Sequence, residues 1–149
     1  MNGTLTKNQL IFDFASGSLG PAKSIFASTY LYLNSKASKI YSTFENIMGD
    51  ELVNNHDSEL KNVKYSDCMS IKQTEAKSFI QDESPLCKIV GPLDKIKWKQ
   101  VYKGFNEFSP SINDKDEIKL IKMDPGASVP LHSHGGREYI LVLKGSFCD

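Results

Sequence analysis

Three residues near the end of the sequence have the types and the spacing of a metal site. His132 and His134 are two positions apart, and Glu138 follows after the glycines Gly135 and Gly136. Residues two apart on a strand face the same side, so the imidazoles would point to one place, and the returning chain would bring the carboxylate there. Two neutral nitrogens and one carboxylate suit zinc, iron, manganese, nickel or copper, and they leave positions for a fourth ligand, water or a substrate.

The pattern around these residues is longer than an isolated His-x-His pair. It is G-x5-H-x-H-x3-E-x6-G from Gly126 to Gly145, and the apolar run Tyr139–Leu143 lies within it. The whole pattern indicates that the segment descends from a metal site. Arg137, the single arginine of the chain, borders this site. It could pair with Glu138 or with a bound anion, but we favour a solvent-facing turn arginine.

The elements that would position this site are predicted to be strands. After Pro85 the apolar residues alternate over short runs, as in Ile96–Tyr102 and Ile118–Leu120. Turn sequences separate these runs, among them SPSINDKD at residues 109–116. Short alternating runs between turns are typical of antiparallel strands in a sandwich or barrel.

The first 49 residues are predicted to form a helical domain. Thr6 can cap a first helix, and Gly17 breaks it before Pro21 begins a second helix that ends near Asn34. A third helix is expected to end at Gly49. Residues 50–85 are polar and are predicted to be a linker, and residues 86–149 form the strand domain.

Composition excludes several classes of protein. The 149 residues include 18 basic and 18 acidic side chains, so the balanced charge argues against nucleic acid as a partner. No apolar run is long enough for a membrane helix, and the first residues lack the pattern of a signal peptide, so we expect a cytoplasmic protein. Cys68, Cys87 and Cys148 have no CxxC spacing and are interpreted as free thiols, with Cys148 buried on a strand.

The strand domain resembles a known family. The pattern from Gly126 to Gly145 is similar to the first conserved motif of the cupin barrel, and its surroundings resemble the C-terminal cupin of ChrR-type anti-sigma factors. Residues 96–101 (IKWKQV), which contain Trp98, are similar to an LxWxxV phrase of that family. The resemblance implies that His132, His134 and Glu138 match three metal ligands, with zinc the first expectation and iron, manganese or nickel as alternatives.

The N-terminal domain resembles the same family. Residues 9–22 (QLIFDFASGSLGPA) are similar to the opening of its zinc-binding anti-sigma domain. By this resemblance, the four zinc ligands of that domain fall here on Leu5, Tyr30, Asn34 and Ala37, none of which is a zinc ligand. We therefore expect this domain to be held together by a small apolar core instead of by metal.

The family's second cupin motif, which supplies a fourth ligand, does not occur before Asp149. The expectation is therefore an α+β protein with a small N-terminal helical domain and an antiparallel barrel or jelly roll that is incomplete at the C-terminus. Such a barrel would leave an unpaired apolar edge from Tyr139 to Phe147. The sequence indicates a truncated member of the family.

The resemblance implies a regulator that binds an ECF-type sigma factor, with the cupin as a metal-binding sensor and no direct contact with nucleic acid or membrane. It also allows a homodimer through the cupin. Apolar residues that could serve as anchors for the sigma factor, or could form the domain's own core, are Ile25, Phe26, Ile40, Phe44 and Ile47. The alternatives are a metal-dependent cupin enzyme of dioxygenase or isomerase type and an inactive fragment. Binding without catalysis is favoured, because no general base is found beyond the ligands.

Overall fold

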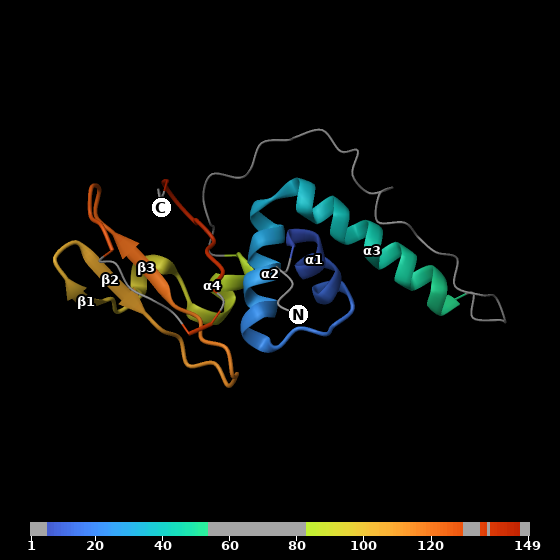
Figure 1. Cartoon of the computed structure of the whole chain (residues 1–149), viewed down its shortest axis with the longest axis horizontal. Helices are drawn as coiled ribbons and strands as arrows, with labels where there is room; N and C mark the ends of the chain where they lie inside the picture. The colour runs from blue at the N-terminus through green and yellow to red at the C-terminus, as the bar shows by residue number, and fades with distance from the viewer. Residues whose placement is uncertain (1–5, 54–82, 130–134, 137, 147–149) are drawn as a thin grey trace.

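The structure, a computed structural model, describes residues 6–53, 83–129, 135–136 and 138–146 (Figure 1). Its N-terminal part, called here the helical unit, contains three α-helices. Its C-terminal part, residues 83–146, is called the sheet unit and contains one short α-helix, a 3-10 turn and three strands. The elements in chain order are α1 Lys7–Ala15, α2 Pro21–Leu33, α3 Ser35–Val53, α4 Pro85–Val90, η2 Leu93–Lys95, β1 Lys99–Tyr102, β2 Phe105–Phe108 and β3 Leu120–Met123.

The ends of α1 and α2 follow local signals in the sequence. Thr6 caps α1, because its hydroxyl accepts a hydrogen bond from the backbone N–H of Gln9 at 3.2 Å. Gly17, with φ of 68°, lies in the left-handed region in the turn after α1. Asn34 alone separates α2 from α3, and its side-chain oxygen accepts from the N–H of Ala37 at 3.0 Å. The three predicted helices are therefore confirmed.

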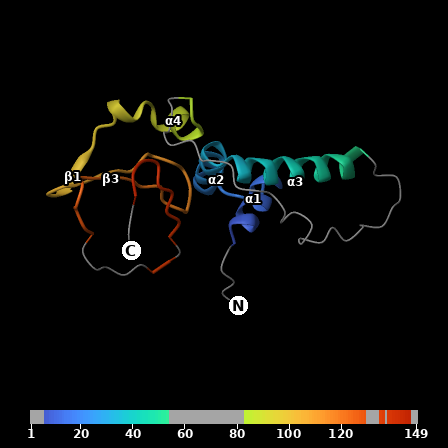
Figure 2. The ribbon, with the colours of Figure 1, turned by 90° about the horizontal axis from the view of Figure 1, so that it is seen from above.

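The end of α3 differs from the prediction. We expected Gly49 to end this helix, but α3 continues to Val53. One glycine inside a helix costs about 1 kcal/mol relative to alanine and does not by itself end it. In Figures 1 and 2 the C-terminal half of α3 extends away from α1, α2 and the sheet unit. Most of the predicted linker, including residues 54–82, lies outside the described residues.

The three strands form one antiparallel sheet in the order β1-β2-β3. Lys103 and Gly104 connect β1 to β2, and Gly104 has a φ of 76°. A Cβ atom at Gly104 would also lie 3.3 Å from that of Ala127, so glycine suits this turn in two ways. Lys99 stands opposite Glu107 in the register, and their charged atoms lie 3.7 Å apart. An antiparallel sheet is thus present, as predicted, and β1 and β3 overlap the runs Ile96–Tyr102 and Ile118–Leu120. The first residues of the predicted strand domain instead form α4, because Ser84 caps this helix and Pro85 suits its first position. The described residues do not form a closed barrel.

The segment after the predicted metal motif is extended but is not part of the sheet. We predicted a strand at Tyr139–Leu143, whereas the structure assigns none to these residues. Their burial nevertheless alternates: Ile140 and Val142 are 61% and 46% exposed, while Leu143 packs on the core of the sheet unit. The described part of the predicted apolar edge is therefore only partly exposed, and its last residue, Phe147, lies outside the described residues.

Two apolar clusters hold the described residues together. The first, the helical core, consists of buried Ile11, Leu31, Ala37 and Ile40 with half-buried Phe14, Tyr30, Tyr41 and Phe44. The second, the sheet core, consists of buried Leu86, Ile96 and Leu120 with half-buried Ile25, Val90, Leu93, Trp98, Phe108, Ile118 and Leu143. Ile25 belongs to α2, so this helix contributes to both clusters and joins the two units. Among the described helices, none has the length and apolar character needed to cross a bilayer.

Candidate functional site

The predicted metal ligands lie at the edge of what the structure describes. His132, His134 and Arg137 are outside the described residues. Glu138 is described and exposed at the start of the extended segment that returns to the body of the protein. Within residues 6–53, 83–129, 135–136 and 138–146, no three metal-binding side chains come together. The predicted site of His132, His134 and Glu138 therefore remains a prediction.

The next residue, Tyr139, connects this segment to the helical unit. Its ring lies against that of Phe26 on α2, with centroids 5.9 Å apart and the planes tilted by 59°. This is a normal distance and angle for a favourable aromatic pair. Tyr139, which follows the predicted ligand Glu138, thus contacts α2, the helix that contributes to both cores.

In the helical unit, the positions that the resemblance aligns with zinc ligands have other roles. Ala37 is 3% exposed in the helical core, and Tyr30 packs against that core, where burial raises the pKa of its hydroxyl. Asn34 caps α3 as described above, and Leu5 lies outside the described residues. Tyr30 and Ala37 therefore fill space with apolar atoms, in agreement with the expectation of a small core.

The predicted anchors are used mostly inside the molecule. Ile40 is buried in the helical core, Ile25 packs on the sheet core, and Phe26 contacts Tyr139. Phe44 packs on the helical core, and Ile47 is half-buried on the projecting part of α3. Most of the apolar side chains that the sequence suggested as anchors for a partner therefore pack inside this protein.

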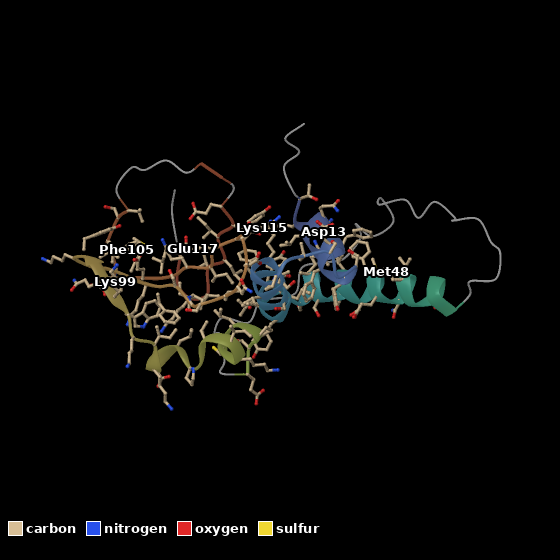
Figure 3. All side chains as sticks on the ribbon, turned by 90° about the horizontal axis from the view of Figure 1, so that it is seen from below. Asp13, Met48, Lys99, Phe105, Lys115 and Glu117 are labelled. Atoms are coloured by element: carbon tan, nitrogen blue, oxygen red, sulfur yellow. The ribbon has the colours of Figure 1, made fainter. Side chains whose placement is uncertain are left out.

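An apolar surface nevertheless remains on α1 and α3, and sequence reasoning did not single out its most exposed member. Phe12 is 43% exposed and meets Phe44 edge to face, with ring centroids 5.5 Å apart. Ile47 and Met48 follow Phe44 by three and four positions, so they lie on the same side of α3. Figure 3 shows Met48 on the part of α3 that lies away from the sheet unit. We call these four residues the Phe12 surface.

The sequence also did not identify the polar contact between the units. The loop that was predicted only as a turn, residues 109–116, carries Asp114 to the start of α2. Its Oδ2 accepts a hydrogen bond from the backbone N–H of Ala22 at 2.7 Å. Asp116 Oδ2 lies 3.0 Å from the ammonium of Lys23. Because 92 positions separate Asp114 from Ala22, no local pattern could have predicted this contact.

The cysteines show no catalytic arrangement in the described residues. Cys87 is a free, buried thiol at 5% exposure in α4. Its backbone N–H donates to the hydroxyl of Ser84, which is itself fully buried and caps the helix. Cys87 is therefore a packing residue, as free cysteines commonly are. Cys68 and Cys148 lie outside the described part of the chain.

Comparison with known proteins gives a match of fold. No family model matches the sequence, and no curated protein matches it either. A search of solved structures finds a chain from the crystal structure of Rhodobacter sphaeroides SigE in complex with the anti-sigma ChrR. The TM-score is 0.65 at 20% identity, and the match covers 87% of this chain and 70% of the other. Since a match of this extent cannot omit either unit, the α+β arrangement of helical unit and sheet unit is similar to the fold of that chain.

Proposed function

We propose that this protein is a ChrR-like regulator that binds an alternative sigma factor of the ECF type through its helical unit. The observation that carries the proposal is the similarity of fold, over 87% of the chain, to a chain from a complex of a sigma factor with an anti-sigma factor. The phrase at residues 9–22, which resembles the anti-sigma domain, agrees with it. The protein would act by stoichiometric binding, which hides surfaces of the sigma factor.

The Phe12 surface is the part of the helical unit best suited to this role. Aromatic and aliphatic side chains at i, i+3 and i+4 spacing are typical of a helix that binds an apolar groove or helix of a partner. Phe12 is more exposed than Phe44, Ile47 and Met48. Its ring contacts that of Phe44, and the other two residues follow Phe44 on the same side of α3. A few large side chains that become buried at the centre of an interface contribute most of its binding energy, and Phe12 is the most exposed large side chain of this surface.

The first prediction concerns Phe12→Ala. This variant should weaken binding of the full chain to its ECF sigma factor by about tenfold or more, because hot-spot aromatics contribute at least this much. Affinity would be measured by calorimetry, after a pull-down against the ECF sigma factors of the source genome identifies the partner. Circular dichroism would show that the helices are retained.

The matched control is Ile89→Ala, which removes an apolar side chain that is 56% exposed on α4 of the sheet unit. This variant should bind with unchanged affinity. The proposal fails if the wild-type chain retains no ECF sigma factor. The assignment of the Phe12 surface fails if both variants bind as the wild type does.

We further propose that the sheet unit carries a metal-binding sensor formed by His132, His134 and Glu138. Glu138 is exposed, so an ion can reach its carboxylate, and two imidazoles with one carboxylate fit zinc, iron, manganese or nickel. A bound divalent ion would supply open coordination positions for the sensed small molecule. Glu138 would hold the ion next to Tyr139, whose ring contacts α2.

The second prediction concerns this metal. The full chain, purified with zinc present, should contain stoichiometric metal by elemental analysis, and H132A/H134A should lose it because two of three directed bonds are removed. Glu138→Gln should reduce the metal content, whereas Glu117→Gln, an exposed acid elsewhere in the sheet unit, should not. Zinc retained in H132A/H134A would place the metal elsewhere and contradict the sensor proposal.

A further inference from the structure

The first turn of α2 has an unusual cap. The residue before the helix is Gly20, which has no side chain to accept a hydrogen bond, and the first helical residue is Pro21, which has no N–H. The first backbone donor of α2 is therefore that of Ala22. This donor is satisfied by Asp114, from the loop between β2 and β3.

Hydrogen bonds within the loop orient this carboxylate. Asp114 Oδ1 accepts from the backbone N–H of Lys115 at 2.6 Å and of Asp116 at 3.4 Å, which folds the loop around the side chain. Oδ2 remains for Ala22. In Figure 1 the β2–β3 loop lies at the side of the sheet unit that faces α2. Figure 3 labels Lys115 on this side and Lys99 at the far end of the sheet unit. One oxygen of Asp114 thus binds the loop itself, and the other binds α2.

Two further features complete the contact. Lys23 on the same turn of α2 pairs with Asp116 at 3.0 Å, and both side chains are about one-third exposed. A Cβ atom on Gly20 would lie 2.9 Å from Asp114 Oδ2, closer than real Cβ contacts. The absence of a side chain at Gly20 therefore permits both the capping by Asp114 and the close approach of the loop.

Apolar contacts alone leave the angle between the units less defined. Besides the polar contact, α2 packs against α4, with Ile25 in the sheet core, and the ring of Phe26 lies against that of Tyr139. Such contacts are non-directional, whereas hydrogen bonds weaken steeply when their angle changes. The polar contact at the start of α2 is therefore the part that can fix the orientation.

We propose that Asp114 and Asp116 form a latch on the first turn of α2, which fixes the orientation of the helical unit on the sheet unit and whose opening lets the units move about the Ile25 and Phe26 contacts. The latch concerns this chain alone and does not depend on sigma binding. It gives the sheet unit a mechanical connection to the helical unit that is separate from their apolar packing.

Spin labels on the two units test the latch. The labels would be attached at Ser42→Cys on α3 and Gln100→Cys on β1, two exposed positions, in a background with Cys68→Ser and Cys148→Ser and with Cys87 kept because it is buried. The wild-type latch should give one narrow distance distribution in double electron–electron resonance. Asp114→Ala should broaden it, and the Ala22 amide should exchange with deuterium about five to ten times faster, in line with the loss of a helix cap.

Two further variants separate the latch from the loop's own turn. Gly20→Ala leaves every residue of the loop unchanged but displaces the Asp114 carboxylate, so it should broaden the distribution as Asp114→Ala does. Glu117→Ala removes a charge from the same loop, but Glu117 contacts Ser109 and Lys119 and not α2. This variant should therefore leave the distance distribution narrow. A narrow distribution in Gly20→Ala, or equal broadening in Glu117→Ala, would overturn the proposal. Thermal unfolding of each variant shows that both units remain folded.

Discussion

At the residue scale, single polar side chains determine how the helical unit is assembled. Asn34 ends α2 and caps α3, so one residue sets the turn between two helices. Tyr41 donates a hydrogen bond of 2.6 Å to Glu45 Oε1 one turn later. This bond, with smaller effects of burial and of the Glu45 charge, raises the pKa of Tyr41 to about 12.

The third prediction follows from this pKa. A raised pKa means that the neutral tyrosine is favoured in the folded state, so its stabilising contribution is complete below about pH 10 and is lost as the pH rises to about 12. Glu45→Ala should return the pKa of Tyr41 towards 10, measured by NMR on tyrosine-labelled protein. Glu117→Ala is the control and should leave the pKa of Tyr41 unchanged. A Tyr41 that ionises near 10 in the wild type would contradict the hydrogen bond.

The pKa of Asp114 is shifted in the opposite direction, below its ordinary value. The hydrogen bond from the N–H of Ala22 is the largest cause that lowers its pKa, with smaller contributions from the N–H groups of Asp116 and Lys115 and from the charge of Lys115. A lowered pKa favours the carboxylate in the folded state. The contribution of this residue is therefore present at neutral pH and is lost only as the pH falls below the ordinary range of aspartate.

At the element scale, α1 and α3 are held by the helical core. Ile11 on α1 is 2% exposed and packs with Leu31, Ala37 and Ile40 from the other two helices. Because few side chains of this unit are fully buried, the hydrophobic stabilisation of the unit is small. Its stability should therefore be sensitive to a single truncation.

The fourth prediction compares two isoleucines. Ile11→Ala should lower the free energy of unfolding by about 2–5 kcal/mol, because it removes buried methyl groups and leaves a cavity. Ile89→Ala, the same substitution at an exposed position on α4, should change it by about 0.5 kcal/mol or less. Urea unfolding followed by circular dichroism measures both. Equal effects would show that Ile11 is not a core residue.

At the scale of the whole molecule, α2 is the element that makes one body of two units. Leu31 of α2 is buried in the helical core, while Ile25 on the same helix packs on the sheet core. Its start is capped by Asp114, and its middle contacts Tyr139. The residue after Glu138 thus contacts α2 directly, so the segment that contains this predicted ligand lies one contact from the helical unit.

Local structure was predictable because its causes are close together in the sequence. The cap at Thr6, the breaks at Gly17 and Pro21, and the apolar periodicity of α1 and α2 all act within one or two helical turns. The same holds for the alternation that predicted strands after Pro85. The predicted end of α3 at Gly49 was wrong, because one glycine inside a helix costs only about 1 kcal/mol and the helix continues to Val53.

The candidate sites were predictable only as far as they consist of motifs. The types and spacing of His132, His134 and Glu138 are properties of the sequence, and they predict a metal site that the described residues do not test. The use of Ile25 and Phe26 inside the molecule, by contrast, depends on which surface of the sheet unit lies against α2. Periodicity marks a residue as apolar but does not identify its neighbour.

The sequence by itself determined the three N-terminal helices, the presence of antiparallel strands and the residues of the metal-binding motif, since capping, turn formation and periodicity depend on residues a few positions apart. Only the tertiary structure decided that Phe12 stays exposed, that Ile25 packs on the sheet core, and that Asp114 caps a helix 92 positions away. The physical reason is that burial and long-range hydrogen bonds are set by how the two units pack around α2, and no spacing along the chain encodes that packing.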